Sequence, residues 1–167
     1  MKQVLAALAL LFFAATAFAQ WKTDGMLEAP PNRSAGLYAG NAKQDIQRAL
    51  ASATKSHKRV LLVFGGDWCY DCHVLEYNFH QDPALHSLLE SNYKLVNVDV
   101  GKYDKNLDLA AKYKMNLSKG VPALAVLDPG GKLLYSDPGG FFEHARGMTK
   151  QEVADFLAQW APPRKKP

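Results

Sequence analysis

An unbroken apolar run, Val60–Phe64, most strongly limits the folds open to this chain. The run has the length of one strand, and Gly65 and Gly66 end it. Because its apolar residues follow one another instead of alternating with polar ones, the pattern predicts a central strand buried on both faces. A strand of this kind needs a packing layer on each side of its sheet, which favours an α/β fold.

The two cysteines of the sequence, Cys69 and Cys72, follow this strand directly. A bridge between them closes a very small loop, so it adds little stability through the entropy of the unfolded chain. The pattern after the strand predicts a helix, and a helix N-terminus favours a thiolate over a thiol. We therefore expect a reactive pair, in which Cys69 attacks a substrate disulfide and Cys72 resolves the mixed disulfide.

The rest of the pattern alternates helices and strands. The predicted elements are a helix capped by Asn41 and ending near Ser56, the strand 60–64, helices over 69–81 and from Asp82-Pro83 onward, a strand over 93–98, a helix over 104–115, strands over 123–127 and 133–135, and a helix after the capping box Thr149–Glu152. The strand–helix–strand start implies parallel pairing, and the terminal hairpin implies antiparallel pairing. The prediction is an α/β fold with a mixed four-stranded sheet and helices on both faces.

The N-terminus has the pattern of a signal peptide over residues 1–19. Lys2 precedes an apolar run, Val4–Phe13, and Ala17–Ala19 is a small-x-small cleavage site. The run is shorter than the roughly 20 residues that span a bilayer. We therefore expect cleavage after Ala19, a periplasmic or secreted protein, and no membrane attachment after cleavage.

The remaining sequence divides into three parts. Residues 20–40 contain prolines and glycines without a sustained period, which indicates an irregular extension that can pack on the domain. Residues 41–161 hold the predicted elements as one domain, and residues 162–167 are a basic tail.

The formal net charge of +4 is mild and lies partly in the two ends of the chain. We expect no nucleic-acid partner, because such proteins usually carry a dense basic face.

Several segments together resemble the thioredoxin superfamily over about Asn41–Trp160. They are Val60–Phe64, Trp68–Cys72, Val96–Asp99, Gly120–Pro122 and the Gly130-Gly131 hairpin. Asp67–Cys69 and Phe79–Pro83 are most similar to periplasmic thioredoxin-like thiol–disulfide interchange proteins, namely the C-terminal domain of the disulfide-reducing electron carrier of Gram-negative bacteria. A C-x-x-C near a strand–helix–strand pattern is the general signature of such redox motifs.

The resemblance implies a protein-disulfide reductase or isomerase with a redox-active Cys69–Cys72 disulfide. It implies a cis proline at Pro122 that faces the cysteine pair, and a Val121 backbone that binds an extended substrate peptide. The substrate groove is predicted to comprise Trp68, Tyr70, Asp71, Val121 and Pro122. We expect a monomer without a cofactor or metal, acting on protein disulfides and exchanging electrons with a separate redox partner.

The sequence departs from the thioredoxin pattern behind the site. Thioredoxins bury an aspartate six residues before the first cysteine, and a lysine often pairs with it. Val63 and Leu95 stand at these two positions here. We expect the resolving step to be slower or differently controlled, with water, Asp67, Glu76 or Asp71 as candidate substitutes.

Asp71 lies between the two cysteines. A nearby carboxylate disfavours a thiolate through repulsion between like charges, so Asp71 is expected to raise the pKa of Cys69. This effect destabilises the reduced thiolate form and favours a reductase or isomerase over an oxidase.

Three alternatives stay open at this point. Cys69–His73 matches the C-x-x-C-H attachment sequence of c-type haem, with Met115 or Met148 as a distal ligand, although the flanking strands do not suit a helical haem shell. The two thiolates with His73 form a candidate copper(I) site. The third alternative is a binding module of the same fold without redox turnover.

A polar-aromatic segment precedes the last predicted helix. It contains Phe141, Phe142, His144 and Arg146. Apolar residues beside a helix start commonly act as packing staples, so we expect this segment to cap the core and not to form a lip at the site.

Overall fold

The computed structural model describes residues 25–163. Its helices and strands are α2 (Ala42–Ser56), β1 (Arg59–Gly65), α3 (Tyr70–Gln81), α4 (Pro83–Asn92), β2 (Tyr93–Asp99), α5 (Leu107–Lys112), β3 (Ala123–Leu127), β4 (Leu133–Ser136) and α6 (Lys150–Gln159), with short 3₁₀ turns η1 (Leu117–Lys119) and η2 (Ala145–Gly147). The predicted signal peptide and residues 164–167 of the predicted tail lie outside the described residues.

The four strands form one mixed sheet in the order β2-β1-β3-β4. β1 pairs with β2 in parallel and with β3 in antiparallel, and the β3–β4 hairpin is antiparallel. β1 is thus a central strand, and its residues from Val60 to Gly65 are all buried. The predicted fold class is confirmed.

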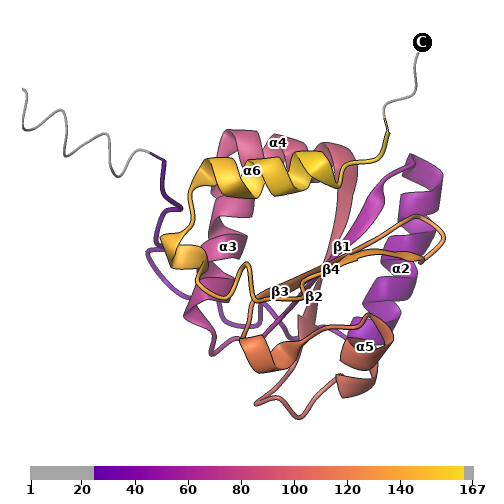
Figure 1. The fold of residues 1–167 in the computed structure, drawn as a ribbon, viewed down its shortest axis with the longest axis horizontal. Helices are drawn as coiled ribbons and strands as arrows, with labels where there is room; N and C mark the ends of the chain where they lie inside the picture. The colour runs from indigo at the N-terminus through magenta and orange to yellow at the C-terminus, as the bar shows by residue number, and fades with distance from the viewer. Residues whose placement is uncertain (1–24, 164–167) are drawn as a thin grey trace, which may run out of the picture.

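Helices cover both faces of this sheet (Figure 1). α2 and α5 lie on one face, where the core includes Val60, Leu62 and Phe64 of β1. α3, α4 and α6 lie on the other face, where Leu61 and Val63 point. Because both faces of β1 are packed, its residues from Val60 to Phe64 are all apolar, and the run in the sequence does not alternate.

Side-chain caps begin three of the helices where the sequence predicts them. Asn41 accepts a hydrogen bond from the amide of Gln44 at the start of α2. Asp82 accepts from two amides in the first turn of α4, which Pro83 opens. Thr149 and Glu152 form a reciprocal capping box at α6. Each cap satisfies amides that lack a partner within the helix.

The helix predicted over 104–115 is shorter in the structure. α5 spans only Leu107–Lys112 because Asn106 before it and Lys114 after it adopt the left-handed conformation, with φ values of 52° and 55°. This conformation interrupts a right-handed helix. Among the described residues, no helix is long and apolar enough to cross a membrane.

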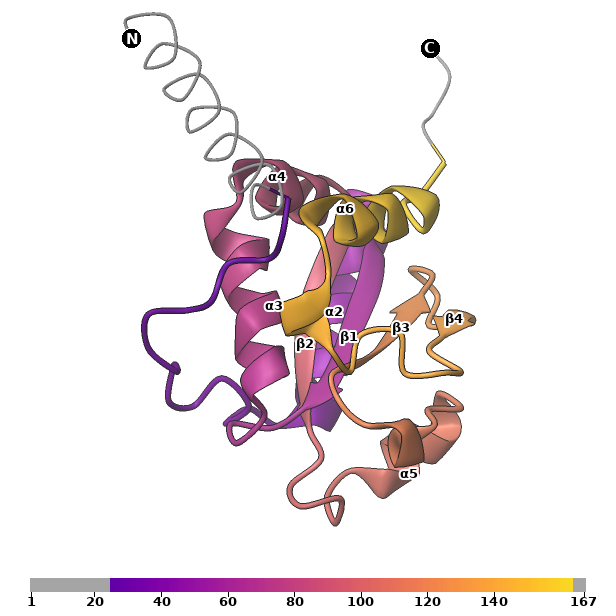
Figure 2. The same cartoon turned by 60° about the vertical axis from the view of Figure 1, so that its left-hand side comes forward.

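The segment before α2 is irregular and packs against the rest of the fold. Figure 2 shows this segment, at the indigo end of the described chain, running along α3. Its Leu27 joins the core under α6, and the Leu27 amide donates a hydrogen bond to the Met148 carbonyl at 2.9 Å. Its Tyr38 joins the core on the opposite face of the sheet, together with the two cysteines.

Candidate active site

Cys69 and Cys72 form a disulfide at the N-terminus of α3, with their Cα atoms 5.3 Å apart. Cys69 is the N-cap of the helix, and its sulfur accepts a hydrogen bond from the Cys72 amide at 3.1 Å. Cys69 is 5% exposed and Cys72 is 1% exposed, so an incoming group reaches Cys69 more easily. The amide and the helix dipole both stabilise negative charge on the Cys69 sulfur.

A tight turn after β1 places Cys69 at this position. The Cys69 amide donates to the Gly66 carbonyl at 2.9 Å and so closes the turn. The Val100 amide, just beyond β2, donates to the Gly65 carbonyl at 2.8 Å. The end of β1 is therefore anchored to its neighbour, and the chain reverses there to begin α3.

The loop before β3 faces the cysteine pair. The Val121-Pro122 peptide bond is cis, as the resemblance implied. The Val121 carbonyl oxygen lies 3.5 Å from the Cys69 sulfur, and both Val121 and Pro122 are buried. Of the residues predicted to form the groove, Val121 is thus in direct contact with Cys69, and Pro122 follows it in the chain.

Trp68 forms an exposed surface beside the pair. The residue is 37% exposed, and its Nε1 donates a hydrogen bond to the Gly101 carbonyl. The ring of Tyr103 lies 5.7 Å from that of Trp68, and the Lys102 ammonium lies 4.8 Å from the Trp68 ring centre. No local sequence pattern marks Tyr103, because only the return of the chain after β2 brings it to this surface.

Asp71 is held in an ion pair with Arg146. The Arg146 backbone amide donates to Asp71 Oδ1 at 2.8 Å, and its Nε donates to Oδ1 at 3.0 Å. Nη2 completes a bidentate contact with Oδ2 at 2.5 Å. Burial opposes ionisation of Asp71, but the hydrogen bonds and charge of Arg146 outweigh it and hold the pKa of this carboxyl below its usual value.

This ion pair corrects two expectations. In the sequence Asp71 is a carboxylate with no evident partner, whereas in the structure Arg146 neutralises much of its charge. Arg146 was expected to cap the core, yet it contacts the motif itself. Of its neighbours, Phe142 is fully buried as expected, whereas Phe141 is half exposed.

Two guanidinium groups lie over the Tyr70 ring. Arg33, from the segment before α2, lies 5.3 Å from the Tyr70 ring centre, and Arg146 lies 4.9 Å from it. Cation–π contacts of this kind hold an aromatic ring in place. The N-terminal segment and the η2 turn therefore meet at the residue that follows Cys69.

His73 does not join the sulfurs as a ligand. It is nearly buried, and its Nε2 lies 2.8 Å from the Asp67 carbonyl oxygen. Within the described part of the chain, no three histidine, cysteine, aspartate or glutamate side chains are grouped to hold a metal ion. A three-ligand copper site that includes His73 is therefore not assembled in this structure.

The position behind the cysteines carries no acid–base pair. Val63 is buried among apolar side chains below α3. Two of the candidate substitutes have other partners, since Asp71 pairs with Arg146 and Glu76 lies 3.0 Å from His80. The carboxylate of Asp67 accepts hydrogen bonds from backbone amides of the N-terminal segment.

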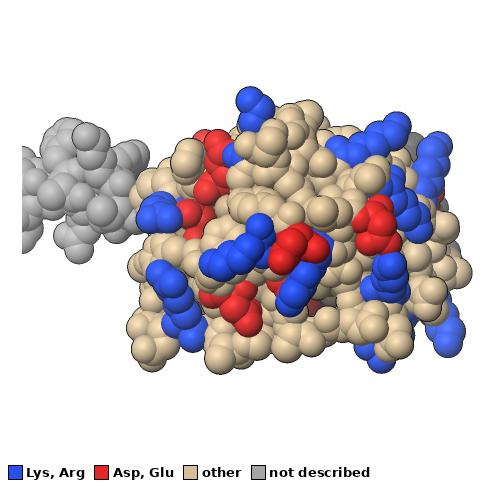
Figure 3. Space-filling model, turned by 90° about the horizontal axis from the view of Figure 1, so that it is seen from below, with Lys and Arg blue, Asp and Glu red and all other residues tan. Residues whose placement is uncertain are grey.

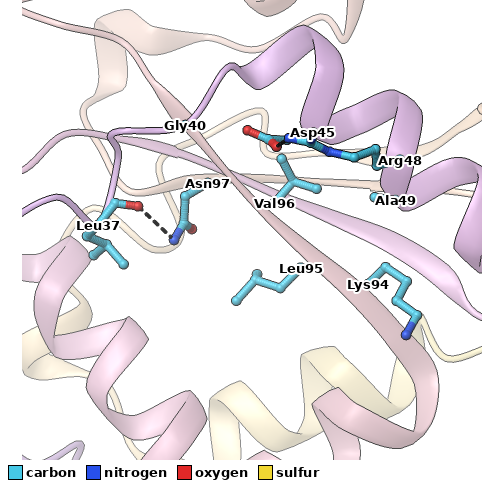
Figure 4. A pocket seen from close by; sticks show the side chains of 9 residues that line it. All are labelled: Leu37, Gly40, Asp45, Arg48, Ala49, Lys94, Leu95, Val96 and Asn97. Carbon is cyan, nitrogen blue, oxygen red and sulfur yellow. Dashed lines mark hydrogen bonds and ion pairs between the residues drawn. The ribbon is translucent and has the colours of Figure 1, made fainter.

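Hollows and charge elsewhere do not suggest a different site. The hollow in Figure 4 lies along β2, the edge strand, and neither cysteine lines it. Figure 3 shows the lower face of the molecule, where Lys and Arg side chains are interspersed with Asp and Glu. This face carries no continuous basic patch.

Comparison with known proteins agrees with this geometry. A family model described as "Thioredoxin-like" matches residues 41–129. The chain belongs to this thioredoxin-like family and carries the C-x-x-C pair of its thiol–disulfide oxidoreductases at Cys69 and Cys72.

Two curated relatives have similar sequences. Thiol:disulfide interchange protein DsbD of Vibrio vulnificus (strain CMCP6) is 33% identical over 98 residues, which is 58% of this chain and 16% of the relative. Thiol:disulfide interchange protein DsbD 1 of Pseudomonas aeruginosa is 32% identical over 87 residues, which is 52% of this chain and 14% of the relative. The chain thus spans only a small part of these relatives.

Two solved structures have the same fold. A disulphide isomerase from Xylella fastidiosa Temecula1 superposes with a TM-score of 0.67 and 32% identity, covering 80% of this chain and 97% of that one. The oxidised C-terminal domain of Neisseria meningitidis DsbD gives a TM-score of 0.51 at 20% identity, covering 71% of this chain and 95% of that one. The second likeness concerns the fold alone.

Proposed function

We propose that this chain is an exported thiol–disulfide oxidoreductase of the protein-disulfide reductase or isomerase type. One observation carries the proposal: the Cys69 sulfur caps α3 and lies 3.5 Å from the Val121 carbonyl oxygen. The first contact stabilises a thiolate, and the second gives an extended peptide a backbone partner beside it. The disulphide isomerase from Xylella fastidiosa, 32% identical over most of this chain, supports the same activity.

The reaction proceeds through a mixed disulfide. The Cys69 thiolate attacks one sulfur of a protein disulfide, and the other substrate sulfur leaves as a thiolate that water protonates. The Cys72 thiolate then attacks Cys69, which forms the Cys69–Cys72 disulfide and releases the second substrate thiol. A separate redox partner returns the two electrons to the pair, and no other cofactor takes part.

The groove residues have distinct roles in this scheme. The Val121 backbone binds the peptide, and Pro122 holds that backbone opposite the sulfurs. Trp68 and Tyr70 present aromatic surface on either side of Cys69 in the sequence. Asp71 acts with Arg146 as a pair that carries little net charge, which supports a less oxidising couple than a cation between the cysteines would produce.

The proposal includes the expected placement in the cell. Residues 1–19 act as a signal peptide, and the mature protein works as a periplasmic or secreted monomer. Protein disulfides are its substrates. The oxidising compartment outside the cytoplasm suits a redox-active pair of this kind.

Trapping of the mixed disulfide tests the activity. Cys72→Ser removes the resolving thiol, so this variant is expected to accumulate a covalent adduct with a disulfide-bonded protein on non-reducing gels, whereas Cys69→Ser is not. The Cys69–Cys72 potential, measured in glutathione buffers, is expected near the thioredoxin value of about −270 mV. If Cys72→Ser forms no adduct, the proposed oxidoreductase activity is wrong. A potential of about −120 mV would show that the pair acts as an oxidant and not as a reductant.

A further inference from the structure

The Tyr38 hydroxyl lies beside the resolving sulfur. Tyr38 is 4% exposed and belongs to the same core cluster as both cysteines. A Cβ atom added to Gly65 would stand 2.7 Å from Cys72 Sγ and closer still to Tyr38 Oη. The phenol oxygen and the sulfur therefore border one small space, which the glycine at the end of β1 leaves open.

This hydroxyl has no hydrogen-bond partner while the cysteines are joined. Across residues 25–163, Tyr38 Oη and Asn97 Oδ1 are the two fully buried side-chain polar atoms without one. A buried hydroxyl without a partner costs stability, so each such group in a native fold calls for an explanation. A disulfide sulfur is a weak acceptor, whereas a thiolate accepts a strong, charge-assisted hydrogen bond. Reduction of the pair would therefore provide the missing partner.

The segment that carries Tyr38 is held from two sides. The Asp67 carboxylate accepts hydrogen bonds from the Tyr38 amide at 3.1 Å and from the Gly36 amide at 3.2 Å. From β2, Asn97 Nδ2 donates to the Leu37 carbonyl at 3.4 Å, the dashed line in Figure 4. Because Asp67 belongs to the turn that positions Cys69, the backbone at Tyr38 is tied to the cysteine motif.

The phenol stays protonated at neutral pH. Burial raises the pKa of Tyr38 far above its ordinary value of 10.0, and the negative charges of Glu76, Asp67 and Asp99 raise it further. A phenol in this state acts as a hydrogen-bond donor and not as a base.

We propose that Tyr38 donates a hydrogen bond to the Cys72 thiolate and so stabilises the resolving sulfur, for which the apolar side chain of Val63 supplies no acid–base group. The inference rests on the proposed function. When a thiolate attacks Cys69, the Cys69–Cys72 bond breaks, and Cys72 leaves with the electron pair as a thiolate. Tyr38 stabilises this leaving group and keeps its own proton, and water later protonates the thiolate. In the opposite direction, the same contact lowers the pKa of Cys72 and raises the fraction of thiolate that attacks Cys69.

Tyr38→Phe in the full chain tests this contact. In a Cys69→Ser background, where Cys72 titrates alone, the ultraviolet absorbance of the thiolate reports its pKa. We expect the variant to lower the acid dissociation constant of Cys72 about tenfold, because a hydrogen bond to a charged group is lost. With both cysteines present, reduction of the disulfide by dithiothreitol is expected to slow severalfold.

Tyr93→Phe is the matched control. It removes another buried hydroxyl, which donates to the Leu157 carbonyl at 2.7 Å in the other core cluster. This variant is expected to lose thermal stability while the pKa of Cys72 stays unchanged. If Tyr38→Phe shifts neither the pKa nor the rate more than Tyr93→Phe does, the inference is overturned.

An NMR measurement on the wild-type protein tests the same contact without any substitution that could prevent folding. With ring-labelled tyrosine, the carbon bearing the Tyr38 hydroxyl is expected to change chemical shift when the disulfide is reduced at a pH that ionises Cys72. An unchanged shift contradicts the contact. A shift in a protein that fails to form mixed disulfides supports the contact and overturns the proposed function alone.

Discussion

The electrostatic effect expected of Asp71 differs between the sequence and the folded structure. In the sequence it is a carboxylate between two cysteines, and its charge alone disfavours a thiolate at Cys69. In the structure only 8% of its side chain is exposed, and Arg146 contacts both carboxylate oxygens. The electrostatic effect on Cys69 therefore depends on two residues that are far apart in the chain.

Removing either charge of the Asp71–Arg146 pair is expected to shift the redox potential of the Cys69–Cys72 couple. The two removals shift it in opposite directions. Asp71→Asn leaves the Arg146 cation uncompensated near the motif, so the pKa of Cys69 falls and the potential becomes more oxidising. Arg146→Met leaves the carboxylate uncompensated, so the pKa rises and the potential becomes more reducing. Equilibration with glutathione buffers measures both.

A remote ion pair serves as the control for these two variants. Lys43 and Asp108 form an exposed pair at 2.6 Å between α2 and α5. Asp108→Asn is expected to leave the potential unchanged. Shifts of the same sign for Asp71→Asn and Arg146→Met would show that lost packing, and not charge, controls the pair.

At the scale of elements, one carboxylate joins three segments. Asp82 caps α4 through its Oδ1, which accepts from the Ala84 and Leu85 amides at 3.0 Å. Its Oδ2 lies 3.1 Å from the ammonium of Lys150 at the start of α6. Lys150 also pairs with Glu28 of the N-terminal segment at 2.7 Å. The corner between α3 and α4 is thereby held against α6.

Asp82→Ala is expected to lower the free energy of unfolding by about 1–2 kcal/mol, because α4 loses its cap. Asp82→Asn keeps a capping oxygen and loses only the charge, so a smaller loss is expected. Urea unfolding measures both variants. Equal losses would indicate that the contact with Lys150, and not the cap, accounts for the stability. Neither variant is expected to change the redox potential.

At the scale of the whole molecule, acid is expected to weaken the fold. The backbone hydrogen bond from Leu85 and the contacts with Lys150 hold the pKa of Asp82 below its usual value, despite its burial. The pKa of Asp71 is lowered too, because Arg146 outweighs the effect of its burial. A carboxyl with a lowered folded-state pKa stabilises the fold above its unfolded-state pKa, and this stability is lost as the pH falls through the folded-state value.

The free energy of unfolding is therefore expected to decrease as the pH falls below about 4, the ordinary pKa of an aspartate. Urea unfolding between neutral pH and about pH 2 measures the effect. A variant with both Asp71→Asn and Asp82→Asn is expected to start from a lower stability and to lose less of it in acid. An equally steep decrease in that variant would assign the acid sensitivity to other carboxyls.

The features that the sequence predicted correctly are local or periodic. The unbroken run at Val60–Phe64 indicates a strand buried on both sides, since no polar residue is tolerated there. Asn41, Asp82 and Thr149 mark helix starts because a side-chain cap acts within three residues of its own position. The spacing of Cys69 and Cys72 places both sulfurs on one helical turn.

Other features depend on contacts between distant segments and carry no local signal. The backbone conformation at Asn106 and Lys114 shortens α5, and neither residue is a glycine that would have indicated it. The sequence by itself determined the fold class, the helix starts and the spacing that lets Cys69 and Cys72 join in a disulfide, because each follows from short-range geometry. Only the tertiary structure brought Arg146 onto Asp71 and Tyr38 beside Cys72, because such pairings arise when packing of the sheet and helices brings remote loops together.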